Sequence, residues 1–250
     1  MARVRLDQHL VELGLAPSRQ RAQALVLAGQ VVVGDHAAAK PGQLVDPAAQ
    51  VRFKGEPMPW VSRGALKLIA AFDRFSIDVQ ERTALDVGAS TGGFTDVLLA
   101  RGARAVCAVD VGHNQLAWKL RSDPRVTVRE GLNARFLVAS DLPFAPDLVV
   151  CDASFISLEL LLPPMLTVGA RAEWVVVLVK PQFEVGRAEV GKGGVVRDPV
   201  ARQAAVDKIA ACARGLGAHV EGVVESPITG PAGNVEFLMA LRPAATTDGA

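Results

Sequence analysis

Two charged residues stand directly after apolar runs that have the length of buried strands. Lys180 follows Val175–Val179, and Asp152 follows Leu148–Cys151. A charge at the end of a buried strand is unfavourable unless it is paired or functional. A lysine in a partly desolvated site can serve as a general base near neutral pH. If the two strands are neighbours, the lysine and the carboxylate meet at one rim of a sheet, as a catalytic pair or as a structural ion pair.

A glycine-rich turn follows another apolar run. Residues 85–96 read LDVGASTGGFTD, which gives Gly88, Gly92 and Gly93 the spacing G-x-x-x-G-G. Glycines permit a tight turn and a close approach of the backbone to a ligand. The spacing is not the dinucleotide G-x-G-x-x-G, and no P-loop lysine follows, so nothing indicates a pyrophosphate or triphosphate site. The turn instead resembles motif I of S-adenosylmethionine (SAM)-dependent methyltransferases; a turn without a ligand is the alternative.

Polar residues follow the next two predicted strands. Asp110 comes about twenty residues after the turn, where an acidic side chain can bind ribose hydroxyls or cap a helix. Asn133 could read an adenine edge or simply belong to a loop. The cofactor-binding candidates are therefore Asp86, Gly88, Ala89, Ser90, Thr91, Gly92, Gly93, Phe94, Asp110 and Asn133.

Strand and helix patterns alternate through most of the chain and must position these residues. Near-continuous apolar strands separated by helices predict a parallel sheet covered on both faces. The expected fold is thus α/β: a Rossmann-like, doubly wound, mostly parallel sheet, closed by an antiparallel pair. The strands are predicted at Ala84–Val87, Ala105–Val109, Val126–Val128, Leu148–Cys151, Val175–Val179, Val220–Val224 and Val235–Leu241, and the helices at 63–75, 93–101, 114–121, 157–166 and 199–213.

The first 58 residues have a different pattern. A short amphipathic helix ends near Gly14, and Ser18 is a candidate N-cap for a second helix closed by Gly29. Short strand candidates follow, which predicts a small α+β module. Residues 1–67 carry nine Lys and Arg against five Asp and Glu. We expect domains at 1–58 and 63–243, a linker at 59–62 and a frayed tail at 244–250.

The composition sets broad limits. The chain has 250 residues, half of them hydrophobic, with 27 Lys and Arg against 26 Asp and Glu, so net charge neither requires nor excludes nucleic acid. Its three cysteines lie far apart, which fits reduced thiols rather than a disulfide framework or a zinc site. The first residues lack a signal-peptide core, and no apolar run has the length of a membrane span. We expect a cytoplasmic protein without a metal, and favour a monomer.

Taken in order, several segments resemble the TlyA-type (hemolysin A-like) rRNA 2′-O-methyltransferases, with an FtsJ-like catalytic domain. The resemblance runs from about residue 3 to about residue 242. It implies SAM as methyl donor and a catalytic tetrad of Lys67, Asp152, Lys180 and Glu236; read alone, Lys67 is a solvated helix residue and Glu236 an outward-facing strand residue. The supporting segments are 62–68, 86–96, 108–112, 179–184, 191–198 and 233–237.

The resemblance also implies the substrate and its binding surface. The target would be the ribose 2′-hydroxyl of cytidine in 16S and/or 23S rRNA within ribosomal subunits. Lys180 would activate the hydroxyl, Asp152 would pair with Lys180, and the other two residues would tune the site and orient the ribose. The first module resembles an S4 domain, and the glycine-rich segment 186–198 is expected to be a mobile substrate loop. The RNA-binding candidates are Arg3, Arg5, Arg19, Arg21, Lys40, Lys192 and Arg197.

One departure and three alternatives remain. Pro59 precedes Trp60 and Val61 where the family's linker often has arginine, which leaves the linker conformation open. The chain could instead methylate a small molecule or a protein, or bind RNA without catalysis. The family's older name suggests a haemolytic, membrane-active protein, but the sequence offers no membrane-inserting segment beyond ordinary core patterns.

Overall fold

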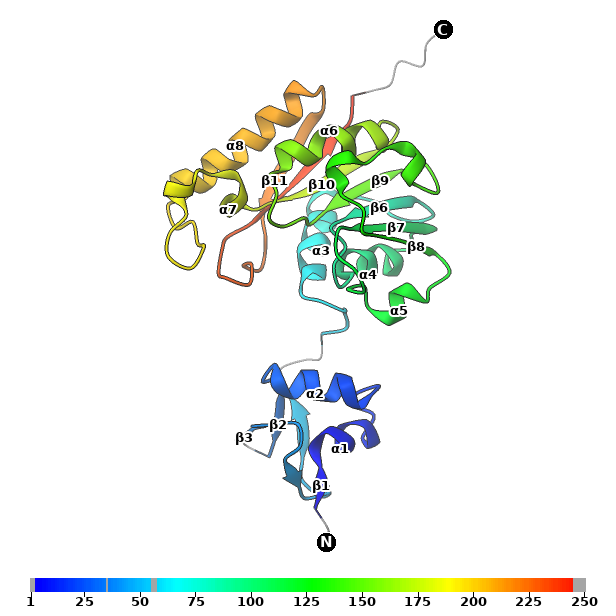
Figure 1. Cartoon of the computed structure of the whole chain (residues 1–250), viewed down its shortest axis with the longest axis vertical. Coiled ribbons are helices and arrows are strands. Elements are labelled where there is room, and N and C mark those ends of the chain that lie inside the picture. Colours follow the sequence, from blue (N-terminus) through cyan, green and yellow to red (C-terminus); the bar gives the residue numbers. More distant parts are fainter. Residues whose placement is uncertain (1–2, 35, 55–57, 245–250) are drawn as a thin grey trace. The chain divides into compact units, whose positions relative to one another are not determined.

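The computed structural model describes residues 3–34, 36–54 and 58–244 (Figure 1). Contacts between Cα atoms divide the chain into two compact units, Met1–Pro59 and Trp60–Ala250. The division falls inside the segment 59–62 that the sequence suggested as a linker. The predicted tail 244–250, apart from Ala244, lies outside the described residues.

The first unit is a small α+β domain, as predicted. Ser18 caps its second helix by accepting a hydrogen bond from the backbone N–H of Arg21 at 3.2 Å. Leu6 and Leu10 of the first helix pack with Ala22 and Val26 of the second over Val31 of the sheet. Two helices, α1 (Leu6–Glu12) and α2 (Arg19–Leu27), accompany the strands β1 (Val4–Arg5), β2 (Val31–Val33), β3 (His36–Ala37), β4 (Leu44–Val45) and β5 (Val51–Phe53). Strand β1 pairs with β4, and β2 lies between β3 and β5.

The second unit contains a seven-stranded sheet in the order β11-β12-β10-β9-β6-β7-β8. Strand β12 is antiparallel to both neighbours, and the pairs from β10 to β8 are parallel. The doubly wound prediction and the closing antiparallel pair are confirmed. The strands are β6 (Thr83–Val87), β7 (Ala105–Asp110), β8 (Val126–Glu130), β9 (Leu148–Cys151), β10 (Trp174–Val179), β11 (His219–Glu225) and β12 (Phe237–Arg242).

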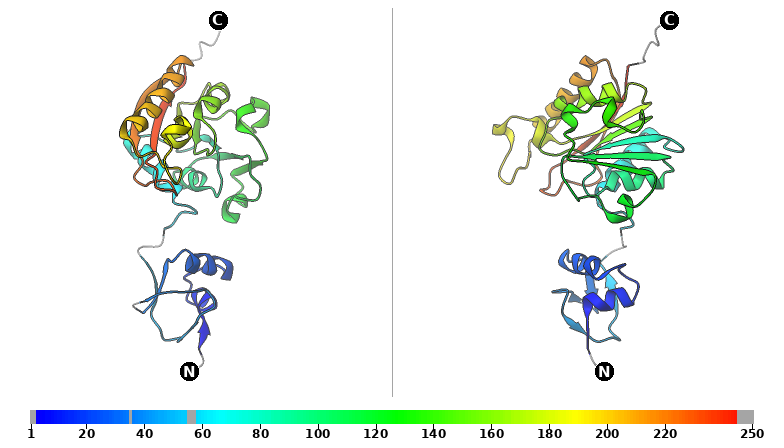
Figure 2. Two further views of the ribbon diagram at one scale, coloured as in Figure 1. Left: turned by 60° about the vertical axis from the view of Figure 1, so that its left-hand side comes forward. Right: turned by 45° about the vertical axis from the view of Figure 1, so that its right-hand side comes forward.

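Helices cover both faces of this sheet (Figures 1 and 2). Helices α3 (Gly64–Phe75) and α4 (Gly93–Ala100) pack against even-numbered strand residues such as Val150 and Val176. Helices α6 (Leu158–Val168) and α8 (Pro199–Gly215) pack against odd-numbered ones such as Val149 and Val175. This alternation is what a strand buried on both faces requires. The short helical segments are α5 (Trp118–Arg121), α7 (Pro181–Glu184), η1 (Ala134–Phe136), η2 (Ala139–Asp141) and η3 (Arg187–Glu189).

The predicted helix 114–121 is wrong at its beginning, because only Trp118–Arg121 is helical. Carboxylates hold the preceding residues in another conformation. Asp110 accepts from the backbone N–H of Gly112 at 2.7 Å, and Glu130 accepts from the backbone N–H of Gln115 at 3.3 Å. These bonds to neighbouring strand ends replace the helical ones. Among the described residues, no helix is both long enough and apolar enough to cross a membrane.

Asp86 makes the stability of the second unit depend on pH. Its side chain is wholly buried in β6, one oxygen accepts from the Thr95 hydroxyl at 2.6 Å, and the other lacks a partner among the described residues. Burial raises the pKa of this carboxyl to about 7. The folded state therefore binds the proton more tightly than the unfolded state. This contribution to stability is complete below about pH 4 and is lost as the pH rises through about 7.

We expect Asp86→Asn to become progressively more stable than the wild type between pH 4 and pH 8, by up to about 4 kcal/mol at the upper end. Urea unfolding followed by tryptophan fluorescence measures this, because Trp60, Trp118 and Trp174 all lie in the second unit. Asp73→Asn, at an exposed position, is the control and should keep the wild-type pH dependence. A stability difference between Asp86→Asn and the wild type that does not change with pH would contradict the assignment.

Candidate active site

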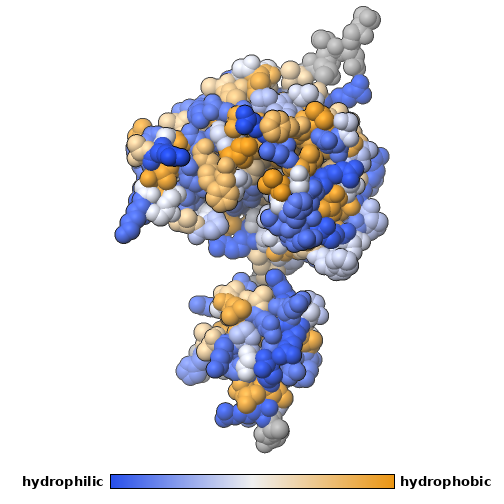
Figure 3. Space-filling view, viewed as in Figure 1, coloured by the Kyte–Doolittle hydropathy of each residue, from blue (hydrophilic) through white to orange (hydrophobic). Residues whose placement is uncertain are grey.

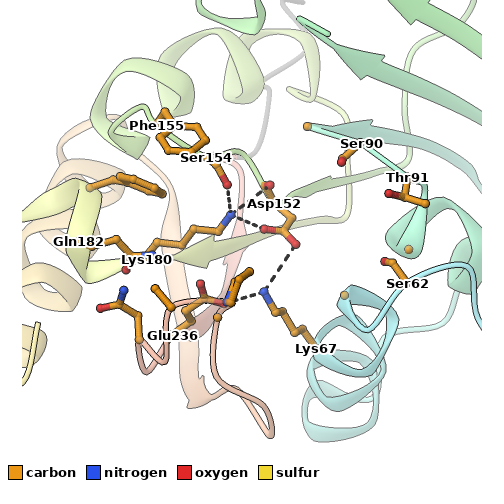
Figure 4. Close-up of a pocket in the computed structure, with 18 of the residues that line it drawn as sticks. Ser62, Lys67, Ser90, Thr91, Asp152, Ser154, Phe155, Lys180, Gln182 and Glu236 are labelled. Carbon is orange, nitrogen blue, oxygen red and sulfur yellow. Dashed lines mark hydrogen bonds and ion pairs between the residues drawn. The ribbon is translucent and has the colours of Figure 1, made fainter. Parts of the chain in front are cut away.

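Four charged side chains meet at the edge of the sheet where β9 and β10 end (Figure 4). Asp152 follows β9, Lys180 follows β10, Glu236 precedes β12, and Lys67 comes from the middle of α3. The three sheet residues are even-numbered and continue the alternation toward the face that α3 covers. The structure therefore brings together the four residues that the family resemblance named.

These side chains form a line of alternating charges. Glu236 Oε2 lies 2.6 Å from Lys67 Nζ, and Lys67 Nζ lies 3.8 Å from Asp152 Oδ2. The other oxygen of Asp152 lies 2.6 Å from Lys180 Nζ. Lys180 also donates to the Ser154 hydroxyl at 2.7 Å and to the backbone carbonyl of Asp152 at 3.3 Å. Two ammonium groups and two carboxylates thus balance, and Asp152 connects the two lysines.

The cluster is buried unevenly. The exposed fraction of the side chain is 8% for Lys67, 7% for Lys180 and 2% for Glu236, against 21% for Asp152. Charges that have left water depend on their partners for compensation. The Lys67–Glu236 pair therefore forms the closed end of the cluster, while the end made by Asp152 and Lys180 is the more open to a ligand.

This cluster forms one wall of a cavity of about 510 Å³. The glycine turn forms another wall, with Gly88, Ala89, Ser90, Thr91, Gly93 and Phe94 among the lining residues. Figure 4 shows Ser90 and Thr91 across the cavity from Lys180. Gly193 and Gly194, from the predicted substrate loop, and Gly230, Pro231 and Asn234, from the loop before β12, also line it.

A second cavity, of about 480 Å³, adjoins the first. Both are lined by Gly88, Ser90, Asp152, Ser154 and Phe155, and the second is also lined by Asp110 and Asn133. A ligand that occupies the second cavity can therefore extend one end to the charged cluster. The Asn133 side chain accepts from the backbone N–H of Arg135 at 3.0 Å, so its oxygen already serves the local turn.

The glycine turn is built by close packing. Gly88 has φ +78°, and a Cβ there would lie 2.9 Å from the Cα of Ala153, so only glycine fits. Asp110 accepts from the backbone N–H of Ser90 at 2.8 Å and thereby ties the turn to the end of β7. Two predicted cofactor-binding residues, Asp86 and Gly92, line neither cavity. Gly92 instead leaves room for the side chains of Leu116 and Leu120.

The predicted RNA-binding residues lie in two places. Arg3, Arg5, Arg19, Arg21 and Lys40 belong to the first unit, and Lys192 and Arg197 to the segment 186–198 of the second. Asn234, which is 2% exposed, holds this segment by accepting from the Val196 N–H at 2.9 Å and donating to the Gly194 carbonyl at 2.8 Å. It thus connects the segment to the neighbourhood of Glu236.

Sequence reasoning missed Ser154, Phe155 and Asn234. Phe155 is 91% exposed at φ +64°, and its ring centroid lies 5.3 Å from that of Phe183. The sequence did contain a sign of Phe155, because this large aromatic residue comes three positions after Asp152, at the end of a predicted strand. The described residues contain no group of three or more His, Cys, Asp or Glu that could hold a metal ion.

Comparisons with known proteins match both units. The model of the FtsJ-like methyltransferase family matches residues 60–243, and that of the S4 domain matches residues 4–51. The 16S/23S rRNA (cytidine-2′-O)-methyltransferase TlyA of Mycobacterium tuberculosis is 51% identical over 96% of this chain and 90% of its own length. Hemolysin A of Brachyspira hyodysenteriae is 39% identical over 94% of this chain and 98% of its own length.

A solved structure from Streptococcus thermophilus, whose provisional name is hemolysin, has the same fold. It superposes with a TM-score of 0.77 at 42% identity, covering 98% of this chain and 90% of that chain. The likeness therefore extends over both units.

We expect the closed end of the cluster to behave as one buried ion pair. Lys67→Met leaves Glu236 buried without its partner and should lower the free energy of unfolding by about 3–5 kcal/mol. Adding Glu236→Gln removes the uncompensated charge and should restore most of that loss. Urea unfolding followed by tryptophan fluorescence measures both variants. Additive losses in the double variant would show that the two side chains do not stabilise each other.

Proposed function

Because this chain belongs to the FtsJ-like methyltransferase family, we propose that it transfers a methyl group from SAM to the ribose 2′-hydroxyl of cytidine in 16S and/or 23S rRNA. The observation that carries the proposal is the Lys67–Asp152–Lys180–Glu236 cluster, which faces the glycine turn across one cavity. The S4 domain match and the names of the relatives support RNA as the substrate class.

The two adjoining cavities fit SAM on one side and a nucleotide on the other. Gly88 lets the turn approach Ala153 closely, and the second cavity beside it is lined by Asp110 and Asn133. We propose that these residues, with Ser90, hold the nucleoside part of SAM. Both oxygens of Asp110 accept backbone N–H groups, which orients the carboxylate for ribose hydroxyls. When bound, SAM supplies an electrophilic methyl group. Asp86 and Gly92 shape the turn from behind rather than contact the cofactor.

The open end of the cluster provides the chemistry. A ribose 2′-hydroxyl is a weak nucleophile at neutral pH, so it needs a group that accepts or polarises its proton. We assign this role to Lys180 Nζ, which Asp152 and Ser154 orient by contacts of 2.6 and 2.7 Å. The Lys180 ammonium first gives one proton to solvent, and the amine that remains takes the proton of the 2′-hydroxyl. Lys67 and Glu236 fix the second oxygen of Asp152 and keep the site electrically balanced. Alignment of the hydroxyl supplies much of the remaining acceleration.

Residues outside the reacting site support RNA as the substrate. The arginines of the S4 unit and the Lys192–Arg197 loop provide positive charge that can contact RNA phosphates. Such contacts supply a large share of the affinity for RNA and make that affinity depend on the salt concentration. Phe155 stands exposed at the mouth of both cavities, where a base removed from its stack could pack against it. Since ribosomal subunits occupy the cytoplasm, we propose that the protein acts there.

The decisive experiment supplies tritiated SAM with purified 30S and 50S subunits from a strain that lacks the protein. We expect label to enter the rRNA of one or both subunits, and nucleoside analysis should identify 2′-O-methylcytidine. Label on ribosomal protein, or on a base rather than a ribose, would contradict the proposal.

Lys180 variants test the proposed proton acceptor. Lys180→Ala and Lys180→Arg should each lower kcat at least about 100-fold, because neither alanine nor a permanently charged guanidinium accepts the proton. Lys180→Arg is the matched variant, since it preserves the positive charge beside Asp152. Calorimetry should show that both variants still bind SAM. Wild-type-like transfer by a folded Lys180 variant would rule out this role.

Phe155→Ala tests the stacking role. A base–aromatic stack contributes about 1–3 kcal/mol, so kcat/KM for ribosomal subunits should fall about 10- to 100-fold, by a larger factor than SAM affinity does. Phe155→Trp preserves a stacking surface and should retain most activity. The control is Phe136→Ala, because Phe136 is also exposed but lines neither cavity. Equal activity of Phe155→Ala and Phe136→Ala would exclude a stacking role.

A further inference from the structure

The S4 unit contains a buried carboxylate that gathers three side chains. Asp7, in the first turn of α1, is 0% exposed. Its oxygens accept from Arg5 Nε at 3.0 Å and Nη2 at 2.9 Å, from Arg19 Nε at 2.9 Å and from Gln23 Nε2 at 2.9 Å. One carboxylate therefore joins the start of α1 to the end of β1 and to the first turns of α2.

The two arginines keep much of their surface in solvent. The side chain of Arg5 is 42% exposed and that of Arg19 is 50% exposed. Among the described residues, Arg19 bonds to Asp7 through Nε only, so its two terminal nitrogens can bind another acceptor. The face of this unit seen in Figure 3 is largely hydrophilic. Asp7 thus fixes one edge of each guanidinium while the remainder faces water.

The charge of Asp7 and the backbone at Gly42 both keep this arrangement in place. The hydrogen bond from Arg5 holds the pKa of Asp7 well below its usual range, so the carboxylate stays charged at any pH where the protein works. On another side, a Cβ at Gly42 would lie 3.0 Å from a terminal nitrogen of Arg5. The backbone at Gly42 and the carboxylate of Asp7 therefore hold the Arg5 guanidinium between them.

We propose that Asp7 is a positioning residue that presents Arg5 and Arg19 as a prearranged clamp for the phosphate backbone of rRNA. The proposal rests on the function proposed above. A guanidinium recognises phosphate through paired N–H groups in a fixed fork, so its orientation matters as well as its charge. Arginines ordered before binding lose less conformational freedom when they bind.

If Asp7 positions the arginines, removing its negative charge should change RNA affinity in the direction opposite to the one that electrostatic repulsion alone predicts. An acidic residue beside a phosphate site repels RNA, so its removal should normally tighten binding. If Asp7 positions the arginines, Asp7→Asn should instead weaken it. We expect Kd for purified ribosomal subunits at about 0.1 M salt to rise about 5- to 20-fold, and KM to rise similarly, while kcat at saturating subunits and SAM affinity stay unchanged.

Two variants serve as controls. Glu12→Gln makes the same charge change on α1, at a side chain that is 64% exposed, and should leave Kd unchanged or lower it. Gly42→Ala leaves every charge in place and requires the Arg5 guanidinium to move by a few tenths of an ångström, so it should weaken binding in the same direction as Asp7→Asn but by a smaller factor. Circular dichroism and thermal melts establish that each variant is folded. If Asp7→Asn does not fold, Gly42→Ala decides.

The outcomes separate this proposal from the proposed function. If the wild-type protein neither binds nor methylates ribosomal subunits, the proposed function fails. If the wild type binds and methylates them, but folded Asp7→Asn or Gly42→Ala binds as tightly as the wild type or more tightly, the positioning role of Asp7 is overturned. Weaker binding by these variants, together with unchanged binding by Glu12→Gln, supports it.

Discussion

The carboxylate of Asp152 stands between two buried lysines, and the arrangement of the second unit depends on this contact. One oxygen serves Lys180, and the other faces Lys67, whose stronger partner is Glu236. Because Lys67, Lys180 and Glu236 are almost fully buried, the removal of any one of them leaves a neighbouring charge without compensation. The site therefore requires a fixed arrangement of four elements: helix α3, the ends of β9 and β10, and the start of β12.

The sheet supplies that register. Parallel pairing sets Val87 beside Cys151 and Cys151 beside Val177, so the strand ends that carry the glycine turn, Asp152 and Lys180 share one edge. Antiparallel pairing of Val179 with Phe237 brings Glu236 to the same edge from the opposite chain direction. The inserted antiparallel strand is thus the feature that completes the charge balance. The candidate site therefore lies where β6, β9 and β10 end and β12 begins.

A buried carboxylate recurs in the first unit with a different consequence. Asp152 connects side chains that face a cavity, whereas Asp7 connects arginines that face solvent. In both places the carboxylate bonds to one side of a cationic group and orients it. The other side of the cationic group is left to contact a ligand. The family match over residues 60–243 and the S4 match over residues 4–51 fit this division of labour between chemistry and RNA binding.

The sequence by itself determined the alternating α/β order, the glycine turn and the positions of Lys180 and Asp152 after apolar strands, because these depend on local periodicity and turn chemistry. The roles of Lys67 and Glu236 came only from family resemblance, since 169 residues separate them and each alone suits a solvated surface. Tertiary structure decided that they pair, that Asp86 and Gly92 line neither cavity, and that residues 114–117 stay out of the helix. It also decided that Asp7 holds two arginines. Each of these features depends on contacts between residues that are far apart in the sequence. The local sequence around each residue does not specify those contacts.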